Sequence, residues 1–150
     1  SLIFPSPSLA VDHYIRENGV LPPDLRNTVI HEMAHGLEME DPVYVPLAAE
    51  YIFRNTDNRY ESLRVLTGLD YHPSEVVRPV KRGRESSISD PYVAKFYTEE
   101  SLGGRAVDPS QVIATEVFSM GLEQLASNPF NFIRRHPEYF SFIWDLIRRP

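Results

Sequence analysis

The stretch over residues 25–39 is the part of this chain that most restricts its fold. Prolines lie close before it and after it, and Gly36 is its only helix-breaking residue. Its apolar residues recur every four positions, which on a helix makes one apolar stripe, at Leu25, Val29, Met33 and Leu37. The pattern predicts an amphipathic helix over residues 25–39.

That helix carries the motif His31-Glu32-Met33-Ala34-His35. An α-helix turns about 100° per residue, so His31 and His35 lie about 40° apart and one turn along the same face. Two imidazoles in this arrangement can bind one zinc ion, and Glu32 lies close enough to take a proton from a metal-bound water. A shuffled chain of this composition would contain roughly 0.014 such motifs, so the pattern is specific.

Two histidines leave a tetrahedral zinc site short of one protein ligand, with the fourth position kept for water. The chain has no cysteine, so the third ligand must be His, Asp or Glu. Glu116 is the best candidate because apolar residues surround it in a predicted helix, where an unpaired carboxylate would be costly. Small Ser119 and Gly121 would permit close helix approach. Asp41 and Glu123 remain the alternatives.

The rest of the chain predicts one α+β domain over residues 1–150, mostly helical, with a small β-sheet or ribbon beside the motif helix. Residues 1–8 read as an extended lead-in, Val76–Val77 as an edge strand and Ile88–Tyr97 as a strand or ribbon. Further helices are expected over residues 11–18, 47–54, 59–67 and 109–126, and from Pro137 onward. The chain lacks an initiator Met, so we expect it to be part of a longer polypeptide.

Composition excludes several function classes. A formal net charge of -6 argues against a general nucleic-acid binder. No apolar run approaches the roughly 18 residues of a membrane span, and the first residues do not form a signal peptide. The absence of cysteine fits the cytosol and an exported domain equally, which leaves localisation open.

The pair His31 and His35, followed much later by Glu116, resembles the gluzincin arrangement of zinc metallopeptidases. More narrowly, the blocks Asp90–Tyr97 and Thr115–Glu123 are similar to zinc peptidase domains attached to phage or prophage head-morphogenesis proteins and toxin-like polyproteins. The likeness spans roughly residues 28–148. One departure is that thermolysin-like gluzincins carry an acidic residue four positions after the Glu ligand, where this chain has Met120. A different set of residues must therefore orient the histidines.

The resemblance implies a zincin-like fold, a Zn²⁺ cofactor and a protein or peptide substrate. Glu32 would act as the general base and then hand its proton to the leaving amine. The oxyanion needs a further donor, and Tyr97 is preferred over Tyr92. Five residues apart on one strand, the two tyrosines would face opposite sides, so at most one could serve. The edge of the aromatic ribbon could bind a peptide by strand pairing.

Two other functions compete with peptide hydrolysis. The first is a structural or interaction domain that retains the fold without useful catalysis, which the intact Glu32 disfavours. The second is a metal-dependent amidase acting on a small or cell-wall substrate. A deep, closed pocket would favour the amidase, and an open groove beside the ribbon would favour proteolysis.

Overall fold

The computed structural model describes residues 23–149. The predicted lead-in over residues 1–8 and the predicted helix over residues 11–18 lie outside these described residues. The α-helices are α2 (Pro23–Glu40), α3 (Tyr44–Asn55), α4 (Leu63–Thr67), α5 (Val117–Ser127), α6 (Pro129–Arg135) and α7 (Pro137–Ile147). Three short 3₁₀ helices lie between them, η1 (Pro91–Ala94), η2 (Glu100–Leu102) and η3 (Pro109–Gln111).

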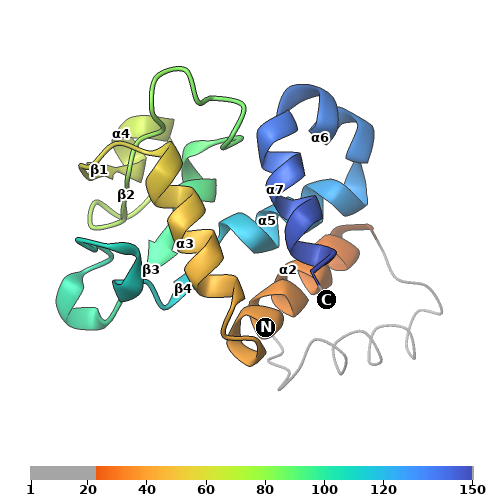
Figure 1. Ribbon diagram of the computed structural model, residues 1–150. Coiled ribbons are helices and arrows are strands. Elements are labelled where there is room, and N and C mark those ends of the chain that lie inside the picture. The colour runs from red at the N-terminus through yellow and green to blue at the C-terminus, as the bar shows by residue number, and fades with distance from the viewer. Residues whose placement is uncertain (1–22, 150) are drawn as a thin grey trace.

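Two small antiparallel sheets complete the fold, so the predicted class, a mostly helical α+β domain, is confirmed. One sheet pairs β1 (Glu61–Ser62) with β2 (Val76–Val77), and the other pairs β3 (Phe96–Tyr97) with β4 (Ala114–Thr115). In Figure 1 the first sheet lies with α4 on one side of the molecule, and α6 and α7 lie on the other. The β3–β4 ribbon leads directly into α5, which packs against α2.

The core forms around α5, whose buried residues include Val117 and Phe118. Phe118 stacks on Tyr44 of α3 with the ring centroids 4.9 Å apart. On the side facing α7, Gly121 leaves no room for a side chain, because an added Cβ would collide with Ile143 and lie 3.1 Å from Tyr139. The close helix approach predicted from Gly121 is therefore present between α5 and α7.

We expect Gly121→Ala to lower the free energy of unfolding by about 1–3 kcal/mol, because Ile143 must leave its packed position. Urea denaturation followed by circular dichroism measures the loss. Gly36→Ala is the matched control, since a Cβ at Gly36 meets no other atom within 4 Å and alanine favours the helix by up to about 1 kcal/mol. Equal effects of the two substitutions would contradict this account of the α5–α7 contact.

The helices predicted over residues 25–39 and 47–54 and from Pro137 are confirmed as α2, α3 and α7. Helix α3 begins three residues earlier than expected, with Pro46 in its first turn, where a proline removes no intrahelical hydrogen bond. The Val76–Val77 strand is also confirmed, and its partner is β1. The predicted helix over residues 59–67 is only α4, which Gly68 ends in a left-handed conformation at φ 71°.

Two predictions near the ribbon were wrong. The helix predicted over residues 109–126 is interrupted, because η3 stops after one turn and Ala114–Thr115 pair with β3 before α5 begins. The strand predicted over residues 88–97 is reduced to Phe96–Tyr97, because the Asp90 side chain caps η1 by accepting from the Tyr92 amide. The sequence prediction also missed α6, which Asn128 caps.

The apolar stripe predicted on α2 is not its buried face. Val29 is buried, but Met33 and Leu37 are 52% and 42% exposed. Ala34 and Glu38 are buried instead, one turn apart on the side that packs against α5 and β4. Because Ala34 is small, this side of α2 can contact α5 closely. The same contact turns His31 and His35 toward α5.

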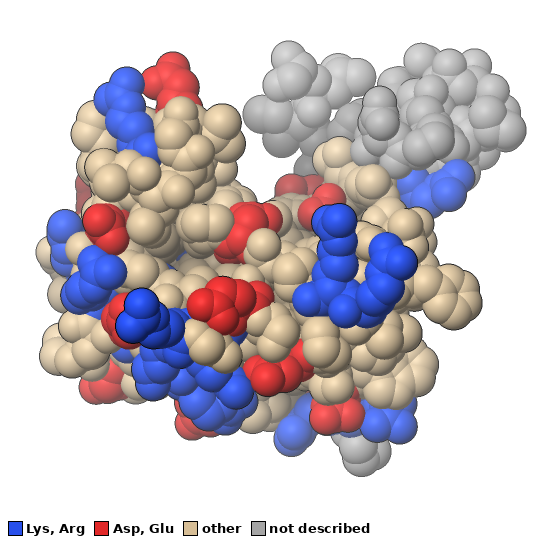
Figure 2. All heavy atoms as spheres, turned by 90° about the horizontal axis from the view of Figure 1, so that it is seen from above, with Lys and Arg blue, Asp and Glu red and all other residues tan. Residues whose placement is uncertain are grey.

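The outer surface carries charge of both signs. Figure 2 shows acidic and basic side chains interspersed on the face seen from above. Among the residues that the structure describes, no helix has both the length and the apolar content needed to cross a membrane.

Candidate metal centre

Helix α2 and the start of α5 bring together His31, His35 and Glu116, residues that the sequence singled out. The two Nε2 atoms lie 3.1 Å apart. Oε1 of Glu116 lies 3.2 Å from Nε2 of His31 and 2.9 Å from Nε2 of His35. Three potential ligand atoms therefore converge on one point. They come from two segments that lie more than 80 positions apart in the sequence, counted from residue 35 to residue 116.

The size of this triangle suits a small tetrahedral ion. Zinc binds nitrogen and oxygen ligands at about 2.0–2.1 Å, which keeps neighbouring ligand atoms about 3.3 Å apart. The observed separations of 2.9 to 3.2 Å need only small adjustments to reach that geometry. Two imidazoles and one carboxylate are also a donor set that zinc accepts. The three residues therefore fit a zinc ion, which would need one further ligand to become tetrahedral.

The carboxylate of Glu116 is held so that its two oxygens have different surroundings. Oε1 faces the two histidines and accepts a hydrogen bond from Ser119 Oγ at 3.2 Å. Oε2 accepts from the hydroxyls of Tyr92 and Tyr97, at 2.9 and 2.8 Å. Glu116 is 4% exposed and precedes α5, where the helix dipole favours a negative charge. This arrangement presents a single oxygen to the histidine pair.

The two tyrosines do not face opposite sides, so that prediction was wrong. Tyr92 lies in η1 rather than on a strand with Tyr97, and the turn brings both hydroxyls to one oxygen of Glu116. The role of Tyr97 as oxyanion donor stays a prediction, while its contact in the structure is with the third candidate ligand.

Each motif histidine also faces a second carboxylate through its other ring nitrogen. Nδ1 of His31 lies 3.2 Å from Oε2 of Glu123, and Nδ1 of His35 lies 3.8 Å from Oε2 of Glu38. Metal-binding histidines commonly donate their outer N–H to such groups, which fixes the orientation of the ring. Glu123, an alternative third ligand in the sequence analysis, thus lies beside the outer nitrogen of His31.

Glu38 was not among the site residues predicted from the sequence, although its position three residues after His35 places it on the same helix face. Its carboxylate is 2% exposed and accepts hydrogen bonds from the amide and hydroxyl of Thr115, the residue before Glu116. A buried carboxylate needs such partners. Glu38 therefore fixes the end of β4, and with it Glu116, against the motif helix.

The charges in this cluster stabilise one another. The hydrogen bond to Glu116 is the largest influence on His35, and together with Glu38 it raises the pKa of His35 to about 10. Glu116 likewise raises the pKa of His31 against the effect of burial. Burial alone would raise the pKa of Glu116, but hydrogen bonds from both histidines and both tyrosines hold that pKa well below its usual range. A metal ion would have to displace the proton that His35 binds.

This coupling predicts a pH dependence for the metal-free protein. Because folding raises the pKa of His35 from 6.5 to about 10, the resulting stability is complete below pH 6.5 and is lost as the pH rises toward 10. Between pH 6.5 and 9 we expect a loss on the order of 2 kcal/mol, measured by urea denaturation of chelator-treated protein. His35→Asn should flatten this dependence. An equally steep decline in that variant would show that another group causes it.

The remaining candidates lie at different places. Glu32 is exposed on α2, directly after His31 in the sequence, and does not belong to the His31–His35–Glu116 cluster. Asp41 accepts a hydrogen bond from the Val43 amide at the turn after α2 and does not belong to the His31–His35–Glu116 cluster. The observed geometry therefore favours Glu116 over Asp41 and Glu123 as the third ligand.

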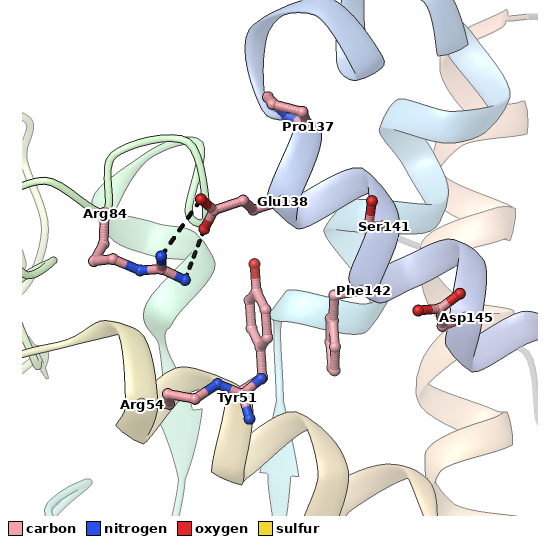
Figure 3. Close-up of a pocket in the computed structure, with 8 residues that line it drawn as sticks. All are labelled: Tyr51, Arg54, Arg84, Pro137, Glu138, Ser141, Phe142 and Asp145. Carbon is pink, nitrogen blue, oxygen red and sulfur yellow. Dashed lines mark hydrogen bonds and ion pairs between the residues drawn. The ribbon is translucent and has the colours of Figure 1, made fainter.

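A hollow of about 430 Å³ lies elsewhere, between α3 and α7, and contains none of the cluster residues. Figure 3 shows Arg84 reaching across it to Glu138, with the ion pair at 2.7 Å. Arg84 also donates to Asn55 at 2.9 Å, and the Tyr51 hydroxyl donates to the Ser87 carbonyl. An ion pair and hydrogen bonds within the protein engage these polar groups, so this hollow is better explained as part of the structural contact between α3 and α7.

Comparison with known proteins adds no assignment. No family model matches the sequence, and no curated protein or solved structure shows significant similarity to the chain.

Proposed function

We propose that this domain hydrolyses peptide bonds with one Zn²⁺ bound by His31, His35 and Glu116. The observation that carries the proposal is the convergence of two Nε2 atoms and one carboxylate oxygen, with separations of 2.9 to 3.2 Å. The outer nitrogens add support, because each faces a carboxylate that can orient its ring. A purely structural ion pair would need neither this orientation nor a free Glu32.

When bound, zinc lowers the pKa of a coordinated water toward about 7 and polarises the scissile carbonyl. Glu32 would take the proton from the attacking water and deliver it to the leaving amine. Tyr92 and Tyr97 would keep Oε2 of Glu116 occupied, so that Oε1 alone points to the metal position. Tyr97 could assist the oxyanion only by giving up its bond to Glu116.

The exposure of the site favours a peptide over a small substrate. The side chains of His31 and His35 are 21% and 26% exposed, and Tyr97 is 37% exposed. A site of this kind is open to an extended chain, whereas a deep pocket would have favoured the amidase alternative. The inactive interaction domain remains the competing function, and a test must separate it from the peptidase.

Metal analysis and a peptidase screen on the same preparation test the proposal. We expect about one zinc per chain after purification without chelators, and cleavage of unfolded protein substrates that stops with chelator and returns with added zinc. Zinc at full occupancy without cleavage would support the interaction domain instead. Zinc well below one per chain in protein that binds no added zinc would refute the metal site itself.

A further inference from the structure

Lys95 stands on the same face of the β3–β4 ribbon as Glu116. The strands pair Phe96 with Thr115 and Tyr97 with Ala114, and the Glu116 amide donates to the Lys95 carbonyl at 3.0 Å, which continues the register by one residue. Directly opposite residues of an antiparallel pair share a face. The side chains of Lys95, Tyr97 and Glu116 therefore stand together, while Phe96 and Thr115 are buried on the other side.

The Lys95 side chain is largely buried, and no carboxylate among the described residues pairs directly with its ammonium group. Lys95 is 6% exposed, and the part of the chain that the structure describes provides no hydrogen bond or ion pair to its ammonium group. Nζ lies 5.5 Å from the centroid of the Tyr97 ring, and an added Cβ at Gly104 would lie 3.7 Å from it. The carboxylates of Glu75 and Glu116 also attract this charge, from beyond ion-pair distance.

The residue expected to neutralise Lys95 is occupied elsewhere. An opposite charge directly across an antiparallel pair is a favourable partner, and that residue is Glu116. Its two oxygens instead accept from the histidines, Ser119 and the two tyrosines. Lys95 is thus left without a direct ion pair beside the candidate metal centre, and the carboxylates of Glu75 and Glu116 attract it only from a longer distance.

The ammonium group remains accessible to a ligand. Lys95 Nζ does not belong to the fully enclosed side-chain atoms that lack a hydrogen-bond partner. Among the described residues, those atoms are His136 Nδ1 and Glu138 Oε2. Nζ therefore keeps contact with solvent at the end of a buried stem, as lysines with apolar stems commonly do.

We propose that Lys95 binds a carboxylate of the ligand that occupies the His31–His35–Glu116 cluster. This inference rests on the proposed function, since it assigns a preference to the same site. For a peptide, the carboxylate is either the free C-terminus or an Asp or Glu side chain close to the scissile bond. Both sources supply the same anionic group, and Lys95 would determine specificity by pairing with it.

Binding of two peptide pairs by the zinc-supplemented protein tests this inference without relying on cleavage. The first pair is N-acetyl-Ala-Ala and its C-terminal amide, and the second is N-acetyl-Ala-Asp-amide and N-acetyl-Ala-Asn-amide. Calorimetry or line broadening in NMR spectra measures the affinities. We expect the carboxylate member of at least one pair to bind about tenfold more tightly than its neutral counterpart, which also identifies the source.

Lys95→Met removes the charge but keeps the stem, and should abolish the difference between the two members of that pair. Lys95→Arg keeps the charge and should retain the preference, with circular dichroism showing that both variants are folded. Equal or undetectable binding of the two members by the unsubstituted protein, or a preference unchanged in Lys95→Met, would overturn the inference. Failure of the proposed peptidase would instead appear as absent cleavage, with the carboxylate preference intact.

Discussion

Glu32→Gln is expected to abolish peptide hydrolysis while leaving the zinc content at about one ion per chain. The amide cannot accept the proton of the attacking water, and general-base catalysis contributes about 10²–10⁴-fold to such reactions. Glu32 is exposed and is not part of the His31–His35–Glu116 cluster, so its replacement should disturb neither the fold nor the ligands. Steady-state cleavage of a fluorogenic peptide and metal analysis of the same sample measure both effects.

Glu40→Gln is the matched control for that substitution. Glu40 is also an exposed glutamate of α2, but it lies at the end of the helix, more than two turns beyond Glu32. Its replacement should leave the cleavage rate unchanged within about a factor of two. A similar rate loss in both variants would indicate a general effect of surface charge. Unchanged cleavage in Glu32→Gln would remove Glu32 from the mechanism.

The second large effect is expected at the third ligand. Glu116→Ala should weaken zinc binding by more than the roughly 10- to 100-fold that loss of an outer hydrogen-bond partner causes, because it removes the proposed third ligand. Competition with a chromophoric chelator measures the affinity. Glu116→Ala also leaves Tyr92 and Tyr97 without their common acceptor. Glu116→Gln is therefore the second variant, because glutamine has nearly the same size as glutamate, and it should also lose zinc affinity.

Comparison with Glu123→Gln and Asp41→Asn separates the possible ligands. Among residues 23–149, Glu123 contacts the outer nitrogen of His31, so its loss should weaken zinc binding by about tenfold. Asp41 caps the turn after α2 and should not affect the affinity at all. If Glu116→Ala retained full affinity while either of the other variants lost it, the third ligand would move to that residue.

The local signals in the sequence were read correctly where they acted alone. Gly68 ends α4 as a left-handed cap, and Pro137 begins α7. The Asp108-Pro109 pair also caps a helical turn, with Asp108 accepting from the Ser110 amide at 2.7 Å. That turn nevertheless ends after three residues, because the Ile113 amide donates to the Tyr97 carbonyl at 2.8 Å. The capping signal was overridden by a strand pairing between residues 97 and 113, which lie 16 positions apart in the sequence.

The same competition explains the error in the aromatic segment. Asp90-Pro91 is a second capping pair of the same kind, and it begins η1 where the aromatic and β-branched residues had suggested a strand. Because this turn moves Tyr92 off the strand, both tyrosines reach Glu116. Sequence alternation alone could not show this, since it assumes that residues 92 and 97 share one regular strand.

What the sequence determined by itself is the spacing within one helix: His31 and His35 must share a face of α2, because helical periodicity is a short-range property of the backbone. Only the tertiary structure decided which carboxylates meet those imidazoles. Glu116 and Glu123 come from a segment about 80 to 90 positions later, and their placement depends on how α5 packs against α2. Packing of this kind is set by the volume and shape of Ala34, Gly121 and their neighbours in three dimensions, which no periodicity along the chain records.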